Sequence, residues 1–357
     1  MKARNFVIPI LIMFVLLGAL FTSELQAKQE QEKQTGTIPD EVKSVLEQGM
    51  ESGEARMDIP FTITDHYYLP ASQNVYFILL FDAKNADIGY TPVGAPETEE
   101  TQEQQAFVEK TQELLQCRFN VFLMFKQVDG DFQKEVFIPA GFQVNKDTYD
   151  PEKIEMYSTG YILPAGKYQL AMGITQNNYQ KIGTQYFEFE LPDPAALKDE
   201  IKAAPAFFID DTQKMEQPET KTYIHKGFFT YSILKIKPIL KNTFNSGQTS
   251  EIFLYVMGGT PDPNTQRFDF SVNYQVLKEG EEQPLIRFAE GNYNSPIIIQ
   301  PLKFERTVLV QKKKGDEVIE EKREKRDIEP GQYILRLDIK DNISGATATK
   351  DVEINIK

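Results

Sequence analysis

The sequence predicts an all-β protein, namely two tandem immunoglobulin-like (Greek-key) β-sandwich domains after a signal peptide and a short tether. Phe and Tyr are abundant, with 25 and 16 copies in 357 residues, and strands favour aromatic residues. Short segments in which apolar and polar residues alternate recur along the chain between turn residues, as they do in sandwiches. The third observation is a closing pattern that occurs twice.

The repeated pattern is a turn with Pro and Gly, a Tyr, a strand, a second turn and a second strand. The first copy reads LPAGKYQLAMGI at residues 163–174 and returns as QYFEFEL at 185–191. The second copy reads IEPGQYILRLDI at 328–339, and apolar residues alternate again at 352–356. Apolar residues at every second position are typical of a half-buried strand. Two copies therefore predict two domains that end in the same kind of hairpin.

Residues 1–27 have the composition of a secretory signal peptide. Lys2 and Arg4 precede an apolar run from Phe6 to Phe21, and Ala27 is a small residue at a plausible cleavage position. The run is short for a membrane span, which needs about 20 residues. We therefore expect cleavage, export to the periplasm or the exterior, and no membrane span in the mature chain. An uncleaved anchor is the alternative.

Residues 28–54 are predicted to be a polar tether followed by a short helix. The tether, residues 28–37, contains no apolar side chain, which favours solvated chain. Pro39 is a residue that starts helices, Val42 and Leu46 have helical spacing, and Gly53 is able to end the helix. We expect this helix to pack as a lid against the first domain.

The first domain is expected at residues 55–194. Its central strand is the apolar run at 75–81, and Asp-Gly-Asp at 129–131 predicts a hairpin turn. The acidic, Gln-rich stretch at 94–105 is predicted to be an exposed insertion, with helix possible towards residue 115. The other expected elements are a strand at 57–63, a turn at 67–72, strands at 119–125 and 136–138, and the closing hairpin at 161–191.

Residues 195–206 are predicted to be a linker, and the second domain is expected at 207–357. Its first strand is either 207–209 or 227–236, and its central strand is the apolar run at 252–257. The remaining expected elements are strands at 268–276, 297–299 and 304–310, a hairpin tip at 312–316, and the final pair of strands.

The net charge of −14 argues against nucleic acid as a partner, because a phosphate backbone requires a basic surface. It also weakens attachment to an anionic membrane surface. The chain has a single cysteine, Cys117, so no internal disulfide can form. Its apolar neighbours predict a buried thiol; an intermolecular disulfide or a reactive thiol is the alternative.

No catalytic residue, metal ligand or cofactor site is predicted. The two histidines, His66 and His225, have no second His or Cys at ligand spacing. Asp65 precedes His66, but neighbours on a strand point to opposite faces, so we interpret both histidines as surface or turn residues. Oxygen-rich stretches at 262–264 and 341–342 are interpreted as turns, with calcium ligands as the alternative. A carboxylate-based hydrolase is the least favoured function, because none of the 53 acidic residues lies in a distinctive motif.

Four tyrosines are candidate ligand contacts because they lie in or near predicted loops: Tyr67, Tyr68, Tyr179 and Tyr293. Exposed tyrosine rings stack on sugars in glycan-binding modules. The alternative is that they are ordinary half-buried tyrosines at the ends of the sandwiches.

Three turn-and-strand motifs carry a resemblance to a known group of proteins. They are Asp58-Ile-Pro-Phe before the strand at 75–82, Lys237-Pro238 before Phe244-Asn-Ser-Gly247, and the repeated closing hairpin. In these motifs residues 55–357 resemble secreted tandem-sandwich proteins related to the bacterial GWxTD-domain-associated proteins. The GWxTD signature is absent, since the chain has no Trp. The resemblance implies an exported β-sandwich protein and supplies no catalytic residues.

These observations predict a non-enzymatic interaction or structural protein of the bacterial cell envelope. The expected partner is another envelope or secreted protein. A glycan-binding module is the alternative.

Overall fold

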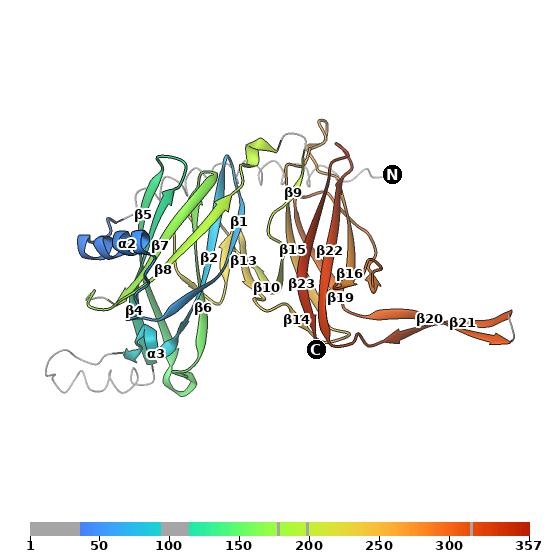
Figure 1. The fold of residues 1–357 in the computed structure, drawn as a ribbon, viewed down its shortest axis with the longest axis horizontal. Helices are drawn as coiled ribbons and strands as arrows, with labels where there is room; N and C mark the ends of the chain where they lie inside the picture. Colours follow the sequence, from blue (N-terminus) through green and yellow to red (C-terminus); the bar gives the residue numbers. More distant parts are fainter. Residues whose placement is uncertain (1–35, 94–113, 177–178, 198–199, 315–316) are drawn as a thin grey trace, which may run out of the picture. The chain divides into compact units, whose positions relative to one another are not determined.

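The computed structural model describes residues 36–93, 114–176, 179–197, 200–314 and 317–357. The described chain is all-β, as predicted, and divides into two compact units (Figure 1). The first unit contains the described residues up to Asp193 together with Lys214–Lys235, and the second contains Pro194–Gln213 and Ile236–Lys357. The chain therefore passes between the units three times. The predicted signal peptide, most of the tether and the acidic insertion lie outside the described residues.

This division differs from the predicted boundaries in two places. The expected linker contains β9 (Lys202–Ala203), and Ile201 and Ala203 are buried in the core of the second unit. Residues 214–235, expected in the second domain, belong to the first unit. Ile224 is buried in the first core, and its burial supplies a physical reason for the return of this segment.

The first unit is a sandwich of two antiparallel sheets around one core. One sheet has the order β1-β2-β6-β11. In the other, β3 and β7 pair with successive parts of β4, β8 pairs with β7, and β5 pairs along the opposite edge of β4. Their bounds are β1 Phe61–Ala71, β2 Asn74–Lys84, β3 Thr91–Pro92, β4 Leu114–Gln127, β5 Gln133–Asn145, β6 Ile154–Leu163, β7 Gly166–Gln176, β8 Ile182–Leu191 and β11 His225–Lys226. The unit also contains β12 (Phe229–Tyr231), helix α3 (Asn85–Ile88) and a 3-10 turn at Lys146–Thr148.

The first strand begins and ends later than predicted. β1 runs from Phe61 to Ala71, and Met57 makes only an isolated bridge to Gly183. The predicted turn at 67–72 was wrong, because Tyr67 to Ala71 pair with β2 and the chain turns at Ser72. A bulge between Ile63 and Asp65 shifts the register, and such a local irregularity has no clear signal in the alternation of one strand.

The predicted central strands lie where the apolar runs place them. β2 pairs with β1 on one side and β6 on the other, and β4 and β5 are joined at the predicted Asp129–Asp131 turn. The two sheets share a core rich in aromatic rings, in which Phe77 stacks on Phe189 at 4.2 Å between ring centroids. Cys117 is 1% exposed and forms no disulfide, so the predicted buried thiol is confirmed.

Helix α2 (Asp40–Ser52) is the predicted lid. Asp40 and Glu41 lie in its first turn, where carboxylates interact favourably with the helix dipole. It ends at Gly53, which has the left-handed φ of 74° that favours glycine. Val42 and Leu46 are fully buried against the outer face of the sheet that contains β4 and β7.

The second unit is also a sandwich of two sheets. One sheet contains β13, β10, β15 and β19 in that order, with β9 also on β15, and the other has the order β14-β23-β22-β16 with β17 and β18 on β16. Their bounds are β10 Phe207–Lys214, β13 Leu234–Pro238, β14 Thr243–Phe244, β15 Thr249–Met257, β16 Phe270–Lys278, β17 Ile286–Arg287, β18 Gly291–Tyr293, β19 Ile297–Lys303, β22 Gly331–Asp341 and β23 Thr347–Ile356. A 3-10 turn at Pro194–Ala196 precedes these strands.

Both units close with the same hairpin, as the repeated pattern predicts. Gly166 of β7 pairs with Leu191, the last residue of β8, and Gly331 of β22 pairs with Ile356, the last residue of β23. In each copy the Tyr hydroxyl donates to the carbonyl oxygen four residues earlier: Tyr168 to Pro164 at 2.9 Å and Tyr333 to Glu329 at 2.8 Å. This contact is the tyrosine corner of Greek-key sandwiches.

Strands β20 (Arg306–Lys314) and β21 (Glu317–Arg326) form a two-stranded sheet of their own. They are inserted between β19 and β22 and extend away from the two sheets of the second unit (Figure 1). Part of the predicted tip at 312–316 lies outside the described residues. Among the described helices, none is long and apolar enough to cross a membrane.

Candidate functional site

The candidate site lies on the outer face of the sheet β14-β23-β22-β16. Along β22, buried residues alternate with residues that face outward. The buried ones are Tyr333, Leu335, Leu337 and Ile339. Register places the outward residues of β22 opposite those of β23: Gln332 opposite Asn355, Ile334 opposite Glu353, Arg336 opposite Asp351, Asp338 opposite Thr349 and Lys340 opposite Thr347. The face therefore contains five rows of side chains.

Two of these rows are closed by hydrogen bonds within the sheet. Arg336 donates to both carboxylate oxygens of Asp351, at 2.9 and 2.8 Å. Asp338 accepts from Thr349 at 2.9 Å and from Gln275 of β16 at 3.1 Å. The hydrogen bond from Arg336 also holds the pKa of Asp351 below its usual value. These rows have little remaining capacity for a ligand.

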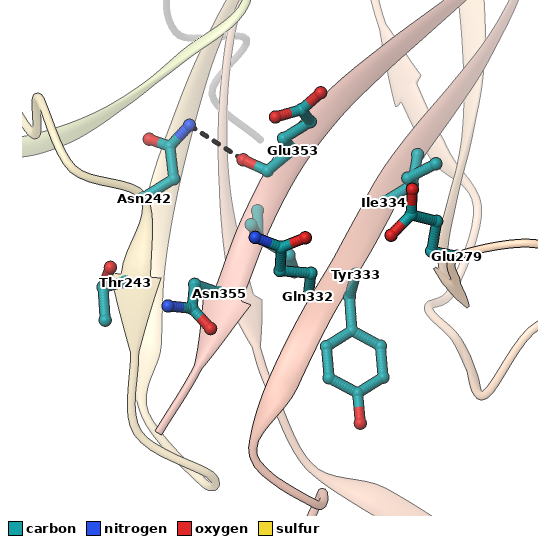
Figure 2. A pocket seen from close by; sticks show the side chains of 9 residues that line it. Asn242, Thr243, Glu279, Gln332, Tyr333, Ile334, Glu353 and Asn355 are labelled. Carbon is teal, nitrogen blue, oxygen red and sulfur yellow. Dashed lines mark hydrogen bonds between the residues drawn. The ribbon is translucent and has the colours of Figure 1, made fainter.

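The rows of Gln332 and Ile334 are open and form a pocket of about 330 Å³ (Figure 2). Its polar lining comes from β14 and the residue before it, from β22 and β23, and from the turn after β16: Asn242, Thr243, Glu279, Gln332, Glu353 and Asn355. Ile334 supplies an apolar part of the lining. Asn242 is held at the edge, because its Nδ2 donates to the carbonyl oxygen of Glu353 at 3.0 Å and its carbonyl accepts from the Asn355 amide at 2.7 Å.

The polar groups of this pocket are largely unused within the described chain. The side chains of Gln332, Asn355, Glu279 and Glu353 make no hydrogen bond to another described residue, and Figure 2 shows a single bond, from Asn242. Both glutamates are exposed. Among the described residues, the pocket lining contains two carboxylates, amides that both donate and accept, and no cation. Such a lining favours a ligand with ammonium, guanidinium or hydroxyl groups.

The structure does not bring the four candidate tyrosines together. Tyr67 and Tyr68 lie within β1 rather than in a loop, and Tyr67 is 4% exposed with its ring centroid 5.8 Å from that of Phe229. Tyr179 follows β7 and packs on the cluster beneath α2. Tyr293 belongs to the other unit, where its hydroxyl contacts Tyr274 at 2.9 Å and donates to Gln300 at 2.6 Å.

Tyr293 nevertheless borders a second depression, of about 570 Å³. Arg267, Asp269, Asn292 and Asn294 also line it. Tyr293 is therefore the candidate tyrosine that lies next to polar side chains in a depression.

Neither histidine lies in a turn: both are partly exposed residues within strands, His66 in β1 and His225 in β11. His66 lies in β1 against Phe77, Phe187 and Phe189, with a closest ring separation of 5.0 Å to Phe187. Burial lowers the pKa of His66 below its usual value. The bulge in β1 shifts the register just before His66, and β8, which is distant in sequence, supplies Phe187 and Phe189. The local sequence around His66 therefore does not predict this aromatic environment.

His225 belongs to a hydrogen-bonded cluster in the returning segment of the first unit. Glu219 Oε2 lies 2.9 Å from His225 Nε2 and accepts from Thr230 Oγ1 at 2.9 Å. Burial acts to raise the pKa of Glu219, but the hydrogen bonds from His225 and Thr230 outweigh it and hold the pKa low. A nucleophilic triad requires the histidine between the acid and the hydroxyl. Here the Glu219 carboxylate contacts both His225 and Thr230. The cluster therefore stabilises the segment and does not activate Thr230.

The thiol of Cys117 has the environment of an unreactive core residue. Burial raises its pKa, which disfavours the nucleophilic thiolate. Nearby, the Tyr90 hydroxyl accepts from Lys226 Nζ at 3.3 Å, and Lys226 is paired with Glu155 at 3.2 Å. This arrangement joins the returning segment to the first sandwich.

The two oxygen-rich stretches are turns, as predicted. Asp262 accepts from the amides of Asn264 and Thr265 at 2.9 and 2.8 Å. Asp341 is fully buried and accepts from the amides of Thr260 and Ile343 at 2.9 and 3.0 Å. Within the described ranges, no group of three or more His, Cys, Asp or Glu side chains has the geometry to hold a metal ion.

Comparison with known proteins does not assign a family. No family model and no curated protein matches the chain. Among solved structures, dimeric latent PorU from Porphyromonas gingivalis is 11% identical with a TM-score of 0.24, over 90% of this chain and 21% of that one. Two alpha-2-macroglobulins are 8% identical: that from Salmonella, reacted with methylamine, has a TM-score of 0.15, and the native form from E. coli has 0.16. They cover 83% and 84% of this chain, which spans 16% of each. The chain thus spans about a fifth or less of these structures.

Sequence reasoning did not identify the residues of the open pocket. Gln332 and Asn355 occupy ordinary outward positions of alternating strands, and Glu279 directly follows a strand. Only the register of β22 against β23 and β16, and the parallel pairing of β14 with the end of β23, brings them together. The sequence signal that could have indicated this site was the series of polar residues at outward positions of the predicted final hairpin.

Proposed function

We propose that this protein is an exported, non-enzymatic interaction or structural protein of the cell envelope, built from tandem immunoglobulin-like sandwiches. We further propose that the open pocket on β22 and β23 binds a partner protein. The observation that carries the proposal is a pocket in which the carboxylates of Glu279 and Glu353 and the side-chain amides of Gln332 and Asn355 make no hydrogen bond to another described residue. The signal-like composition of residues 1–27 supports export.

The chemistry of the pocket favours a basic segment of the partner. Glu279 and Glu353 supply two negative charges, and the whole chain carries a net charge of −14. A Lys or Arg side chain would gain charge-assisted hydrogen bonds there, which are roughly twice as strong as neutral ones. The acidic surface would also raise the rate of encounter with a basic partner.

A sugar is less well matched to this pocket. The one aromatic residue in its lining, Tyr333, is 4% exposed, and its hydroxyl is bound to the carbonyl oxygen of Glu329. The pocket therefore presents no open ring face for stacking. A carboxylate hydrolase is also poorly matched, because a general acid is kept protonated by burial and both glutamates are exposed.

The test is capture of binding partners by the mature chain, residues 28–357, from an envelope extract. The wild-type chain is compared with the double variant Glu279→Gln/Glu353→Gln, and retained species are identified by mass spectrometry. We expect one specific protein with a basic segment to be retained by the wild type. The double variant should retain it at least about tenfold less well, as two charge-assisted contacts are lost.

A matched control removes two acids elsewhere in the second unit. Glu251 and Glu290 are exposed and lie outside the pocket, so Glu251→Gln/Glu290→Gln makes the same change in net charge and should leave capture unchanged. Equal capture of the partner protein by the wild type and both double variants would contradict the proposal that the pocket binds it. A catalytic activity that disappears with one carboxylate would contradict the non-enzymatic proposal.

Glycan binding is the second candidate, and the depression beside Tyr293 is what favours it. Arg267, Asp269, Asn292 and Asn294 supply hydrogen-bonding groups next to the tyrosine ring. A glycan array probed with wild type and Tyr293→Ala tests this candidate. Binding that depends on Tyr293 would support it, and a silent array would count against it.

A further inference from the structure

The β20–β21 ribbon has two unpaired edges. Its strands pair with each other from Arg306↔Arg326 to Lys314↔Glu317, and neither pairs with another described strand. Each outer edge therefore presents backbone N–H and C=O groups that can pair with another strand. Soluble proteins generally cover such edges or protect them with charges and bulges, and an edge that is left free is able to accept an added strand.

The regular part of β21 is short and defined. The register shifts between Lys312 and Lys313 of β20, where Lys312 pairs with Glu320 and Lys313 with Val318. Ile319 is therefore an extra residue, and a bulge ends regular pairing. What remains is residues 320–326, with the sequence Glu-Glu-Lys-Arg-Glu-Lys-Arg.

This seven-residue stretch is complementary to itself when it is reversed. If Arg323 lies opposite its own copy, Glu321 falls opposite Lys325, Lys322 opposite Glu324, and Glu320 opposite Arg326. Every pair away from the centre then joins opposite charges, and the only like pair is Arg323 with its copy. Opposite charges directly across an antiparallel pair are stabilising, and like charges are destabilising.

We propose that two copies of this chain associate by antiparallel pairing of their β21 edges, with a two-fold axis at Arg323. The two ribbons would then form one four-stranded sheet, in the order β20-β21-β21-β20. The contact is isologous, because each copy contributes the same strand and the axis relates them. It uses none of the residues of the open pocket, so it is independent of the function proposed above.

Neighbouring symmetric registers are less favourable. Centring the pair on Lys322 places Glu320 opposite Glu324, and centring it on Glu324 places Arg323 opposite Lys325. The edge of β20 is also less suitable, since Arg306 and Lys312–Lys314 are all basic. The charge pattern therefore favours β21 over β20 and the register centred on Arg323 over its neighbours. It also favours β21 of a second copy as the strand that pairs with this edge.

Lys322 and Glu324 are the best residues with which to test the contact. Within the ribbon they lie opposite Val310 and Val308, so reversing their charges breaks no cross-strand ion pair there. They are 3.7 Å apart within one chain, with side chains 70% and 40% exposed. Across the proposed axis, each would face the other from the second copy.

The experiment is sedimentation velocity of the mature chain over a range of concentrations, at about 50 mM and about 500 mM salt. The proteins are wild type, Lys322→Glu, Glu324→Lys and the double swap Lys322→Glu/Glu324→Lys. Each single reversal creates two like-charge pairs in the dimer, so its dimer Kd should rise at least about tenfold. The double swap restores both pairs and should return Kd to within about threefold of wild type.

Two further samples make the test specific. An equimolar mixture of the two single variants should form heterodimers, because all four facing residues are then paired with opposite charges. Lys340→Glu, an exposed position of β22 outside the ribbon, makes the same net-charge change as Lys322→Glu and should leave Kd unchanged. High salt should weaken the wild-type dimer.

A chain that stays monomeric at every concentration would overturn the proposal and leave the β21 edge for a different partner. A dimer that tolerates both single reversals would also overturn it, since the copies would then meet elsewhere.

Discussion

The two units share a closing hairpin but differ in what lies on its outer face. In both, the first strand of the hairpin begins with a Gly that pairs with the last residue of the second strand. The Tyr two positions after this Gly forms the tyrosine corner. In the first unit, α2 covers the outer face of this sheet; in the second, the face is open and carries the polar rows and the pocket. One framework therefore supports a buried face in one unit and a binding face in the other.

The cause of this difference is visible in the residues that point outward. Beneath α2, β4 and β7 present Phe122, Met124 and Ala171. On the corresponding face of the second unit, β22 presents Gln332, Arg336 and Asp338. A sheet with apolar residues on both faces must be covered on both, whereas an alternating sheet is able to leave one face in water.

The connections before the two tyrosine corners differ as well. Residues 164–165 join β6 to β7, whereas residues 304–330 join β19 to β22 and include the β20–β21 ribbon. Surface connections tolerate long insertions at small cost. The corner survives the insertion because its hydrogen bond is local, within five residues of chain.

The largest predicted effect concerns the helix that covers the first unit. Leu46→Ala should lower the free energy of unfolding of this unit by about 2–4 kcal/mol, because Leu46 is fully buried and packs on Gly173. Ile334→Ala, on the open face of the second unit, should cost less than about 1 kcal/mol. Denaturant unfolding with hydrogen exchange resolved by peptide measures both. Equal losses would contradict the distinction between a covered and an open face.

The second effect concerns the turn of the final hairpin. Asp341→Ala should destabilise the second unit by about 2–3 kcal/mol, since it leaves the backbone amides of Thr260 and Ile343 without their charged acceptor. Burial acts to raise the pKa of Asp341, but the hydrogen bonds it accepts hold the pKa below its usual value of 3.8. The wild type should therefore lose this stabilisation as the pH falls below that value, and the variant should not. Thermal unfolding at several pH values checks this, and parallel pH curves for the two chains would contradict it.

The third effect compares the two corners directly. Tyr168→Phe and Tyr333→Phe each remove one hydroxyl and one hydrogen bond to a backbone carbonyl, of nearly equal length. Each should cost about 1 kcal/mol, in the first unit for Tyr168 and in the second for Tyr333. Hydrogen exchange on the two variants localises the loss. A loss at only one corner would show that the repeated motif does not have the same role in both units.

The smallest effect is a pH dependence confined to the first unit. Burial among phenylalanine rings lowers the pKa of His66 in the folded chain below its usual value of 6.5. The unfolded chain then binds a proton more readily, so stability should fall as the pH drops below about 6.5. His66→Phe keeps the aromatic cluster and should flatten this dependence. The measurement is thermal unfolding between about pH 5 and pH 8, and an unchanged slope would exclude His66 as its source.

The sequence by itself determined the features that depend on local pattern. Alternation and apolar runs predicted the all-β class, the central strands β2 and β15 and the final hairpin, because side-chain period reports strand structure directly. The repeated Pro, Gly and Tyr residues predicted that both units close in the same way. Helical spacing and Gly53 predicted α2 as a lid, and the apolar neighbours of Cys117 predicted a buried thiol.

Only the tertiary structure decided which segments belong together. Residues 214–235 return to the first unit, His66 meets Phe187 across a long sequence separation, and Gln332 faces Asn355 in an open row. None of these follows from local propensity, since each depends on strand register and on which core buries a given apolar side chain. The candidate site belongs to this class: its residues are unremarkable along the chain and form a pocket only where β14, β23 and β22 lie side by side.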